Sequence, residues 1–261
     1  MINRTLFLIL LSLFSTLLSE QSQERLIFVH IPKNGGTSIR TLLYPRFDKE
    51  EVYFRYFVHN IADKPSDWYL PYKFICGHFP LFYIKQIPGK RITFLRDPLQ
   101  RVLSAHQYWE RYWKKRTLRF ARELQLPPGD PLETMQNHQT RFLSGLDPND
   151  PSISIEQHLK LAKKNLKKFF FFGFLEELDE SMHKLFALLD FPLPQDIPKR
   201  NVSKQETYSE ETLQAIRDRN KADIELYEFA KKLYTKRFRN SQPKFTCYHS
   251  LKLRQPPCIS F

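Results

Sequence analysis

The sequence contains little glycine and little cysteine. Only 7 of its 261 residues are glycine, so the adjacent pair Gly35 and Gly36 marks a place where the backbone needs unusual conformational freedom. Three cysteines are present, Cys76, Cys247 and Cys258, and no C-x-x-C motif occurs, which argues against a zinc site. In an oxidising compartment, Cys247 and Cys258 would close the C-terminal tail, residues 241–261, with a disulfide.

The chain also lacks a hydrophobic run of the length usual for a transmembrane helix. Residues 1–19 hold about fifteen largely apolar residues after Arg4, which is short for a membrane span and typical of a signal-peptide core. Leu17 stands where a cleavage site needs a small residue. Three interpretations of residues 1–19 therefore stay open: a signal peptide that is removed, an uncleaved signal anchor, and a buried core helix. Residues 20–24 would be a polar linker, and membrane contact is expected only through residues 1–19.

Acidic residues are too few to balance the basic ones. The chain has 41 Lys and Arg against 28 Asp and Glu, a formal net charge of +13. On charge alone a nucleotide, an acidic polysaccharide, a nucleic acid and an anionic lipid all fit as partners. Hydrophobic residues make up 41% of the chain and aromatic residues 15%, which excludes a disordered chain and is enough for the core of one domain.

The glycine pair belongs to a strand–turn–helix pattern, Phe28-Val-His-Ile-Pro-Lys-Asn-Gly-Gly-Thr-Ser-Ile39. Residues 25–31 predict a strand, and Thr37 and Ser38 are expected to cap a helix that follows to Leu43. Such a junction directs N–H groups at one point and suits phosphate or sulfate, and Lys33 adds a full positive charge. The alternative is an ordinary tight turn with a solvated lysine. The order of residues is not that of a Walker A loop.

A second strand–turn–helix pattern is Arg91-Ile-Thr-Phe-Leu-Arg-Asp-Pro-Leu-Gln-Arg-Val-Leu-Ser104. Asp97 predicts a helix cap and Pro98 the first helical residue. Arg96 falls at the end of the strand, and Arg101 and Ser104 share one helix face, so a receptor for a second phosphate group is expected. The alternative is a surface pair of Arg96 with Asp97 beside a helix cap.

Strand-like and helix-like segments alternate along the chain. This alternation predicts an α/β fold of three layers, with a mostly parallel central sheet flanked by helices. The last helix is expected to run unbroken over residues 209–238, and residues 48–71 remain unassigned. Expected strands are residues 25–31, 73–76, 91–95 and 168–175; the other expected helices are residues 37–43, 98–115, 137–143, 154–167 and 176–189.

Together the two patterns resemble the nucleotide-binding motifs of sulfotransferases that use 3′-phosphoadenosine-5′-phosphosulfate (PAPS). The form P-K-x-G-G-T-S followed by F-L-R-D-P-x-x-R-x-x-S is most similar to the branch of heparan sulfate and uronyl 2-O-sulfotransferases and their bacterial relatives. Further similar elements cover roughly residues 25–237 in order: Cys76-Gly-His78, Asn137-His-Gln-Thr-Arg-Phe-Leu-Ser-Gly145, Phe169–Glu176 and Lys199-Arg-Asn-Val-Ser203.

The resemblance implies a P-loop-like sulfotransferase domain over residues 25–240 and a role for each matching residue. His78 would be the general base, because a histidine of ordinary pKa is largely neutral at pH 7. His138 and Arg141 would face the acceptor. No metal is expected, since lysine and the helix dipole supply positive charge. The residues implied in PAPS binding are Lys33, which would also act in catalysis, then Asn34, Gly35, Gly36, Thr37, Ser38, Arg96, Ser104, Lys199 and Arg200.

The predicted reaction is transfer of a sulfuryl group from PAPS to a hydroxyl of a carbohydrate, and the favoured acceptor is an acidic glycan. Two alternatives are a nucleotide or sugar kinase of P-loop fold and a non-catalytic polyanion-binding protein. No nucleic-acid partner is predicted, because the aromatic and basic residues at 106–119 better fit a core face with a solvated basic side. The expected location is secretory or membrane-anchored: a Golgi-like lumen in a eukaryote, or the cytoplasmic face in a bacterium if residues 1–19 stay attached.

Overall fold

The computed structural model describes residues 25–56, 61, 64–113, 136–194, 196–197 and 207–239. Several predictions fall outside these residues: the signal or anchor segment 1–19, the linker 20–24, Lys199, Arg200, and the tail with Cys247 and Cys258.

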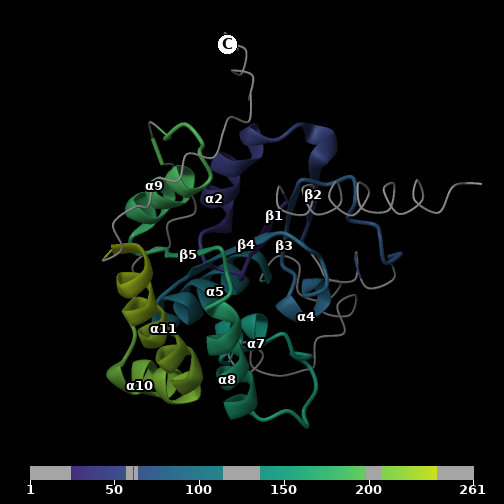
Figure 1. Ribbon diagram of the computed structural model, residues 1–261. Coiled ribbons are helices and arrows are strands. Elements are labelled where there is room, and N and C mark those ends of the chain that lie inside the picture. Colours follow the sequence, from purple (N-terminus) through teal and green to yellow (C-terminus); the bar gives the residue numbers. More distant parts are fainter. Residues whose placement is uncertain are drawn as a thin grey trace, which may run out of the picture.

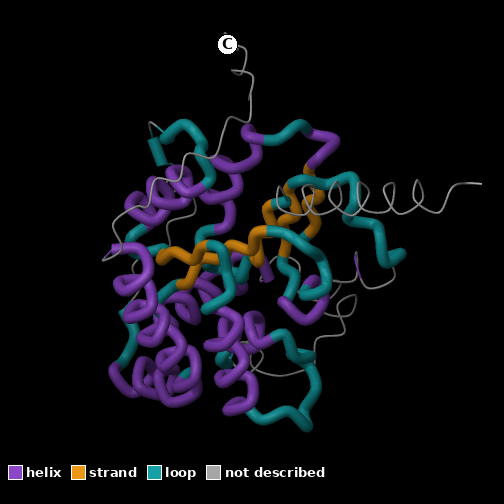
Figure 2. The backbone as a smooth tube through the Cα atoms, in the orientation of Figure 1, coloured by secondary structure: helices purple, strands orange, loops and turns teal. Residues whose placement is uncertain are grey.

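A five-stranded sheet forms the centre of the molecule (Figure 2). Every adjacent pair of strands is parallel. Most strand residues are buried, as expected for a parallel sheet covered on both faces. The order across the sheet is β2 (Val52–Arg55), β3 (Phe74–Gly77), β1 (Leu26–Val29), β4 (Lys90–Leu95) and β5 (Phe171–Phe174).

Helices cover both faces of this sheet (Figure 1). On one face lie α2 (Gly36–Leu43) and α9 (Leu178–Leu188). The other face carries α4 (Leu81–Ile84), α5 (Pro98–Trp113), α7 (His138–Ser144), α8 (Ile155–Leu166), α10 (Glu210–Arg219) and α11 (Lys221–Tyr234), which continues as a π-helical turn, Thr235–Arg239. Short 3-10 turns occupy Tyr44–Arg46 and Lys49–Glu51. The predicted α/β class and three-layer arrangement are confirmed.

Two features of the fold differ from the predictions. The unassigned region 48–71 contains an additional strand, β2, at the edge of the sheet. The expected single helix over residues 209–238 is interrupted at Asn220, which joins α10 to α11. The Asn220 side chain explains the interruption: its amide donates to Ile216 O (2.9 Å), and its Oδ1 accepts a hydrogen bond from the Asn137 N–H (2.9 Å).

The topology brings the candidate residues to one edge of the sheet. Because all strands are parallel, the segments that follow them emerge at the same carboxyl edge. The chain leaves β1 toward α2 on one face and leaves the neighbouring strand β4 toward α5 on the other (Figure 1). Ligands of open α/β sheets bind in the crevice that such a divergence creates.

Candidate active site

The turn after β1 is built around two left-handed backbone positions. Lys33 has a φ of 71° and Gly35 a φ of 73°. A side chain at Gly36 would overlap the imidazole of His30, and one at Gly35 would overlap Leu175. The glycine pair is therefore required by close approach on both sides, which explains its presence in a glycine-poor chain.

Helix α2 begins at this turn. Its first residue is Gly36 and its cap is Gly35, with no side-chain hydrogen bond at the cap. The prediction that Thr37 and Ser38 cap the helix is wrong, because they are its second and third residues. N–H groups in the first turn have no partner within the helix and point outward from its positive end. The helix start at the carboxyl edge thus suits an anion.

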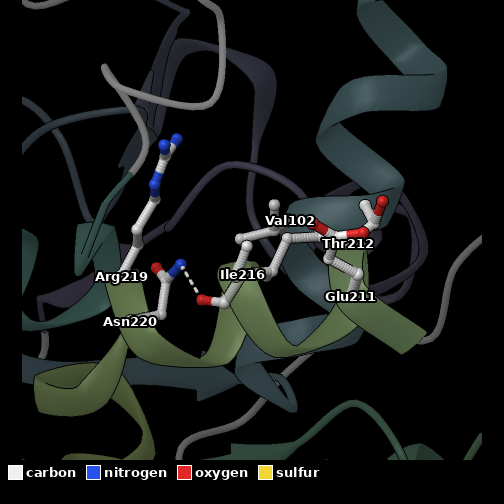
Figure 3. A pocket seen from close by; sticks show the side chains of 7 residues that line it. Val102, Glu211, Thr212, Ile216, Arg219 and Asn220 are labelled. Atoms are coloured by element: carbon white, nitrogen blue, oxygen red, sulfur yellow. Dashed lines mark hydrogen bonds between the residues drawn. The ribbon is translucent and has the colours of Figure 1, made fainter. Parts of the chain in front are cut away.

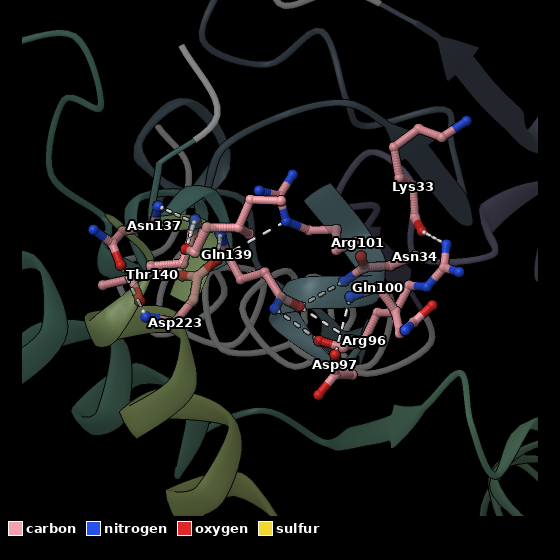
Figure 4. Close-up of polar contacts among 12 residues, drawn as sticks. Lys33, Asn34, Arg96, Asp97, Gln100, Arg101, Asn137, Gln139, Thr140 and Asp223 are labelled. Atoms are coloured by element: carbon pink, nitrogen blue, oxygen red, sulfur yellow. Dashed lines mark hydrogen bonds and ion pairs between the residues drawn. The ribbon is translucent and has the colours of Figure 1, made fainter. Parts of the chain in front are cut away.

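Asn34 holds the turn against the neighbouring strand. Its side chain is buried, and its amide donates to Phe94 O and to Gln139 Oε1, each at 2.8 Å. Arg96, at the end of β4, donates from Nη1 to Lys33 O at 3.1 Å. The two predicted anion sites are therefore connected directly, since Arg96 and Asn34 both join β4 to the turn (Figure 4).

Gln139 is the centre of this connection, and no role was predicted for it. Its fully buried side chain accepts a hydrogen bond from the Arg96 N–H (3.0 Å) and donates to Arg96 O (2.8 Å), in addition to its bond with Asn34. One glutamine thus fixes both the backbone at the end of β4 and the turn after β1. The Asn-x-Gln-Thr-Arg motif singled out its position without indicating that task.

Helix α7, which carries Gln139, is anchored by a buried carboxylate of α11 (Figure 4). Asp223 accepts hydrogen bonds from the N–H groups of Gln139 (3.1 Å) and Thr140 (2.7 Å). Arg101 of α5 lies 3.9 Å from the same carboxylate, and both side chains are completely buried. The prediction of Arg101 and Ser104 as one phosphate-binding face is therefore wrong for Arg101, whose guanidinium faces Asp223 inside the protein.

A second carboxylate, that of Glu176, connects α5 and α11 at the carboxyl edge of the sheet. Glu176, after β5, accepts a hydrogen bond from the Asp97 N–H (2.9 Å) and another from the Tyr227 hydroxyl (2.8 Å). Asp97 Oδ1 in turn accepts from the Gln100 N–H at 2.9 Å, so the predicted cap of α5 is confirmed. The start of α5, which carries Ser104, is thereby fixed to β5 and α11.

His78 follows β3 on the opposite side of the turn from Arg96. Its ring centroid lies 4.5 Å from that of His30 and 5.6 Å from that of Tyr56. Burial, with the nearby charges of Lys33 and Arg40, lowers the pKa of His78 from 6.5 to about 4. The imidazole is therefore neutral at physiological pH and has a nitrogen lone pair available as a proton acceptor.

His30 is a residue of the site that the sequence analysis placed inside the first strand. Strand β1 ends at Val29, and the His30 ring stacks on Phe28 (5.2 Å) between Gly36 and His78. Burial holds the pKa of His30 well below its usual value, and the charge of His78 adds to the effect. Its position two residues before the proline of the turn was the one available signal.

His138 and Arg141, which were predicted to face the sugar acceptor, have different surroundings in the structure. Burial is the main reason why the pKa of His138 is well below its usual value, and His78 is near enough to contribute to this lowering. The His138 ring packs on Phe142, with 4.9 Å between centroids. Arg141 instead donates from Nη1 to Pro148 O at 3.3 Å.

A pocket of about 450 Å³ opens between α5 and α10, and its lining contains none of the predicted site residues (Figure 3). The lining residues are Val102, Glu211, Thr212, Ala215, Ile216, Arg219 and Asn220.

Within the described part of the chain there is no cluster of three His, Cys, Asp or Glu side chains arranged to hold a metal. No helix in the same residues is both long and apolar enough to cross a bilayer.

The amino-acid sequence matches a family model and a curated protein. The model of the sulfotransferase family matches residues 19–230. Heparan-sulfate 6-O-sulfotransferase 2 of Danio rerio is 32% identical over 180 residues, 56% of this chain and 38% of that protein, so the chain spans well under half of this curated relative.

Two solved structures are also similar. A sulfotransferase from Alicyclobacillus acidocaldarius has a TM-score of 0.41 at 14% identity, covering 80% of this chain and 99% of the other. Mouse sulfotransferase SULT7A1, solved in complex with PAP, has a TM-score of 0.40 at 14% identity, covering 87% and 90%.

Proposed function

The chain belongs to the sulfotransferase family, and we propose that it transfers a sulfuryl group from PAPS to a hydroxyl of an acidic glycan. One observation carries the proposal: the turn after β1 and the neutral imidazole of His78 meet at the carboxyl edge of the sheet. A positively charged anion site beside a proton acceptor is what sulfuryl transfer to a hydroxyl requires. The resemblance found in the sequence named a 2-O-sulfotransferase branch, whereas the curated relative is a 6-O-sulfotransferase.

The residues of the turn fit the 5′-phosphosulfate of PAPS. We assign the cradle to the backbone of Gly35 and Gly36 and to Thr37 and Ser38 in the first turn of α2. The absence of a Cβ at Gly36 lets the His30 ring pack directly against the backbone of this cradle. Asn34 has a different task, because its side chain is buried and bonded to β4 and α7; it holds the turn in shape.

Arg96 and Ser104 are assigned to the 3′-phosphate. Arg96 stands at the end of β4, beside the turn, with Nη1 bonded to Lys33 O. Ser104 lies in the second turn of α5, the helix that starts at Pro98. Lys199 and Arg200 are proposed as further contacts of the nucleotide, from a segment outside the described residues.

Lys33 and His78 are assigned to the chemistry. When bound, PAPS supplies an activated sulfuryl group on a phosphate leaving group. Lys33 places its ammonium over the Tyr108 ring, 4.0 Å from the centroid, where it balances negative charge on the leaving group. His78 accepts the proton of the acceptor hydroxyl, since its lowered pKa keeps it unprotonated before the acceptor arrives.

An acidic glycan is the proposed acceptor for two reasons. The net charge of +13 favours a polyanion, and the curated relative is named for heparan sulfate. His138, which is close to His78, is proposed to border the acceptor; Arg141 is proposed to do so more distantly. We further propose residues 25–240 as the catalytic domain, residues 1–19 as a signal or anchor, and a secretory location such as a Golgi lumen.

Transfer of labelled sulfate from PAPS to N-sulfated heparosan by the full chain tests this function. Lys33→Ala and His78→Gln should each lower turnover at least a hundredfold, because each removes a group that acts on the transferring atoms. His183→Gln replaces an exposed histidine of α9 and is the matched control, with expected turnover within twofold of wild type. PAPS binding without transfer to any glycan would identify a binding protein and contradict the proposal.

A further inference from the structure

The edge of the site beyond His78 carries a cation supported by aromatic rings. Arg40 projects from α2 over the ring of Phe54, with its guanidinium carbon 4.0 Å from the centroid. The rings of Tyr44 and Tyr56 lie 5.4 and 5.7 Å from the same carbon. Nη1 of Arg40 also donates to the Tyr56 hydroxyl at 3.3 Å. Three rings therefore fix the position of this guanidinium.

Within the described residues no carboxylate pairs with Arg40, and its side chain contacts aromatic rings and a phenol hydroxyl. Arginine donates five N–H bonds in a planar fork, and the bond to Tyr56 uses only one nitrogen. A guanidinium that is stacked on rings and retains donors is suited to an incoming anion. Its charge also acts on the base, since Arg40 contributes to the lowered pKa of His78.

The exposed ring of Tyr56 extends this surface. Tyr56 follows β2, the edge strand, and is 47% exposed. Its ring centroid lies 5.6 Å from that of His78. An exposed aromatic face beside a catalytic base offers an apolar platform for the face of a sugar ring.

The order of strands sets the direction from which the acceptor enters. The nucleotide groups assigned above follow β1 and β4, His78 follows β3, and Tyr56 follows β2. Sulfuryl transfer, like phosphoryl transfer, needs the attacking and leaving oxygens roughly in line. The acceptor must therefore approach His78 from the side away from Arg96, which is the side of β2, Tyr56 and Arg40.

We propose that Arg40 and Tyr56 form the acceptor subsite, in which the guanidinium binds an anionic group of the sugar chain and the Tyr56 ring packs against a sugar face. The anionic group is a carboxylate or a sulfate next to the accepting residue. This inference rests on the proposed function, and it gives a structural reason for an acidic rather than a neutral acceptor.

Calorimetric titration of the full chain, saturated with 3′-phosphoadenosine-5′-phosphate, tests the subsite with three octasaccharides. These are heparosan, which carries carboxylates only, its carboxyl-reduced neutral derivative, and N-sulfated heparosan. Arg40→Gln should weaken binding of an anionic octasaccharide tenfold to a hundredfold, the loss expected for a charge-assisted contact. Its nucleotide affinity should stay within twofold of wild type. A loss restricted to N-sulfated heparosan identifies sulfate as the anion; a loss for both anionic probes identifies the carboxylate.

Two further variants make the result specific. Arg55→Gln removes an exposed arginine at the end of β2 that packs on Tyr53 instead, and it should change octasaccharide affinity by less than threefold. Tyr56→Phe keeps the ring and should bind more tightly than Tyr56→Ala. Equal losses for Arg40→Gln and Arg55→Gln, or an equal loss on the neutral octasaccharide, would overturn the subsite. Failure of the wild-type chain to bind the nucleotide would instead overturn the proposed function.

Discussion

Replacing Gln139 by methionine should separate the parts of the site, because this one side chain connects them. Methionine preserves most of the length and volume but none of the hydrogen bonds. Gln139 bonds the Asn34 amide (2.8 Å), the Arg96 N–H (3.0 Å) and Arg96 O (2.8 Å). The variant leaves these groups without that partner in a site where Gln139 is completely buried.

The magnitude follows from the number of groups affected. A buried polar group that loses its partner costs about 1–3 kcal/mol. Arg96 is partly exposed to water, and the Asn34 amide keeps its bond to Phe94 O, so the lower value applies to each of the three groups and the free energy of unfolding should fall by about 3 kcal/mol. Affinity for 3′-phosphoadenosine-5′-phosphate should fall more than tenfold, because Arg96 and the turn lose the side chain that positions both and are then held by the bonds of Arg96 to Lys33 O and of Asn34 to Phe94 O.

Urea denaturation and calorimetric titration of the same preparations measure both effects. Gln214→Met is the matched control: this glutamine lies on the exposed face of α10 and forms hydrogen bonds with the surface residues Asp218 and Arg217. Its effect on the free energy of unfolding should be within about 0.5 kcal/mol. Equal behaviour of the two variants would refute the connecting role of Gln139.

Three other predictions concern the same framework. In thermal or urea denaturation, Asp223→Asn should lower the free energy of unfolding by about 3–5 kcal/mol, because it removes the charge that faces buried Arg101. The control Glu225→Gln changes an exposed ion pair and should lower it by at most about 1 kcal/mol. His78 takes up a proton below pH 6.5 in the unfolded state and only near pH 4 in the folded state, so the free energy of unfolding has its full value above pH 6.5 and falls toward pH 4. In urea denaturation, His78→Gln should reduce the loss of this free energy between pH 7 and pH 5 by about 2 kcal/mol, and an unchanged dependence on pH would contradict the lowered pKa. Gly36→Ala should weaken nucleotide binding more than tenfold in calorimetry, since the new methyl group meets the His30 ring, while Thr41→Ala, further along α2, should leave it within twofold.

Local patterns of residues were sufficient to predict the sheet and the turn. Short β-branched and aromatic runs located four of the five strands, and the Asp97-Pro98 pair located the start of α5. Strand β2 was missed because its Val-Tyr-Phe-Arg run lies in an aromatic and charged region and follows a charged 3-10 turn. Only Tyr53 of this strand is buried, so its sequence is less apolar than that of the strands that were located.

The features that local patterns missed depend on contacts distant in sequence. Apolar spacing continues across Asn220, and the break there depends on a hydrogen bond from Asn137. Arg101 and Ser104 share a helix face by spacing, but Asp223 determines that Arg101 lies inside. Gln139 could be located as part of a motif, whereas its partners Asn34 and Arg96 appear only when three elements are placed together.

The most direct test of the account is the preference of the full chain among nucleotides. Calorimetric titrations with 3′-phosphoadenosine-5′-phosphate, AMP and ATP compare ligands that differ in the 3′-phosphate and in the length of the 5′-phosphate chain. We expect the tightest binding for 3′-phosphoadenosine-5′-phosphate, and a loss of its preference over AMP in Arg96→Ala. Preference for ATP, or equal binding of AMP and 3′-phosphoadenosine-5′-phosphate by the wild-type chain, would contradict it.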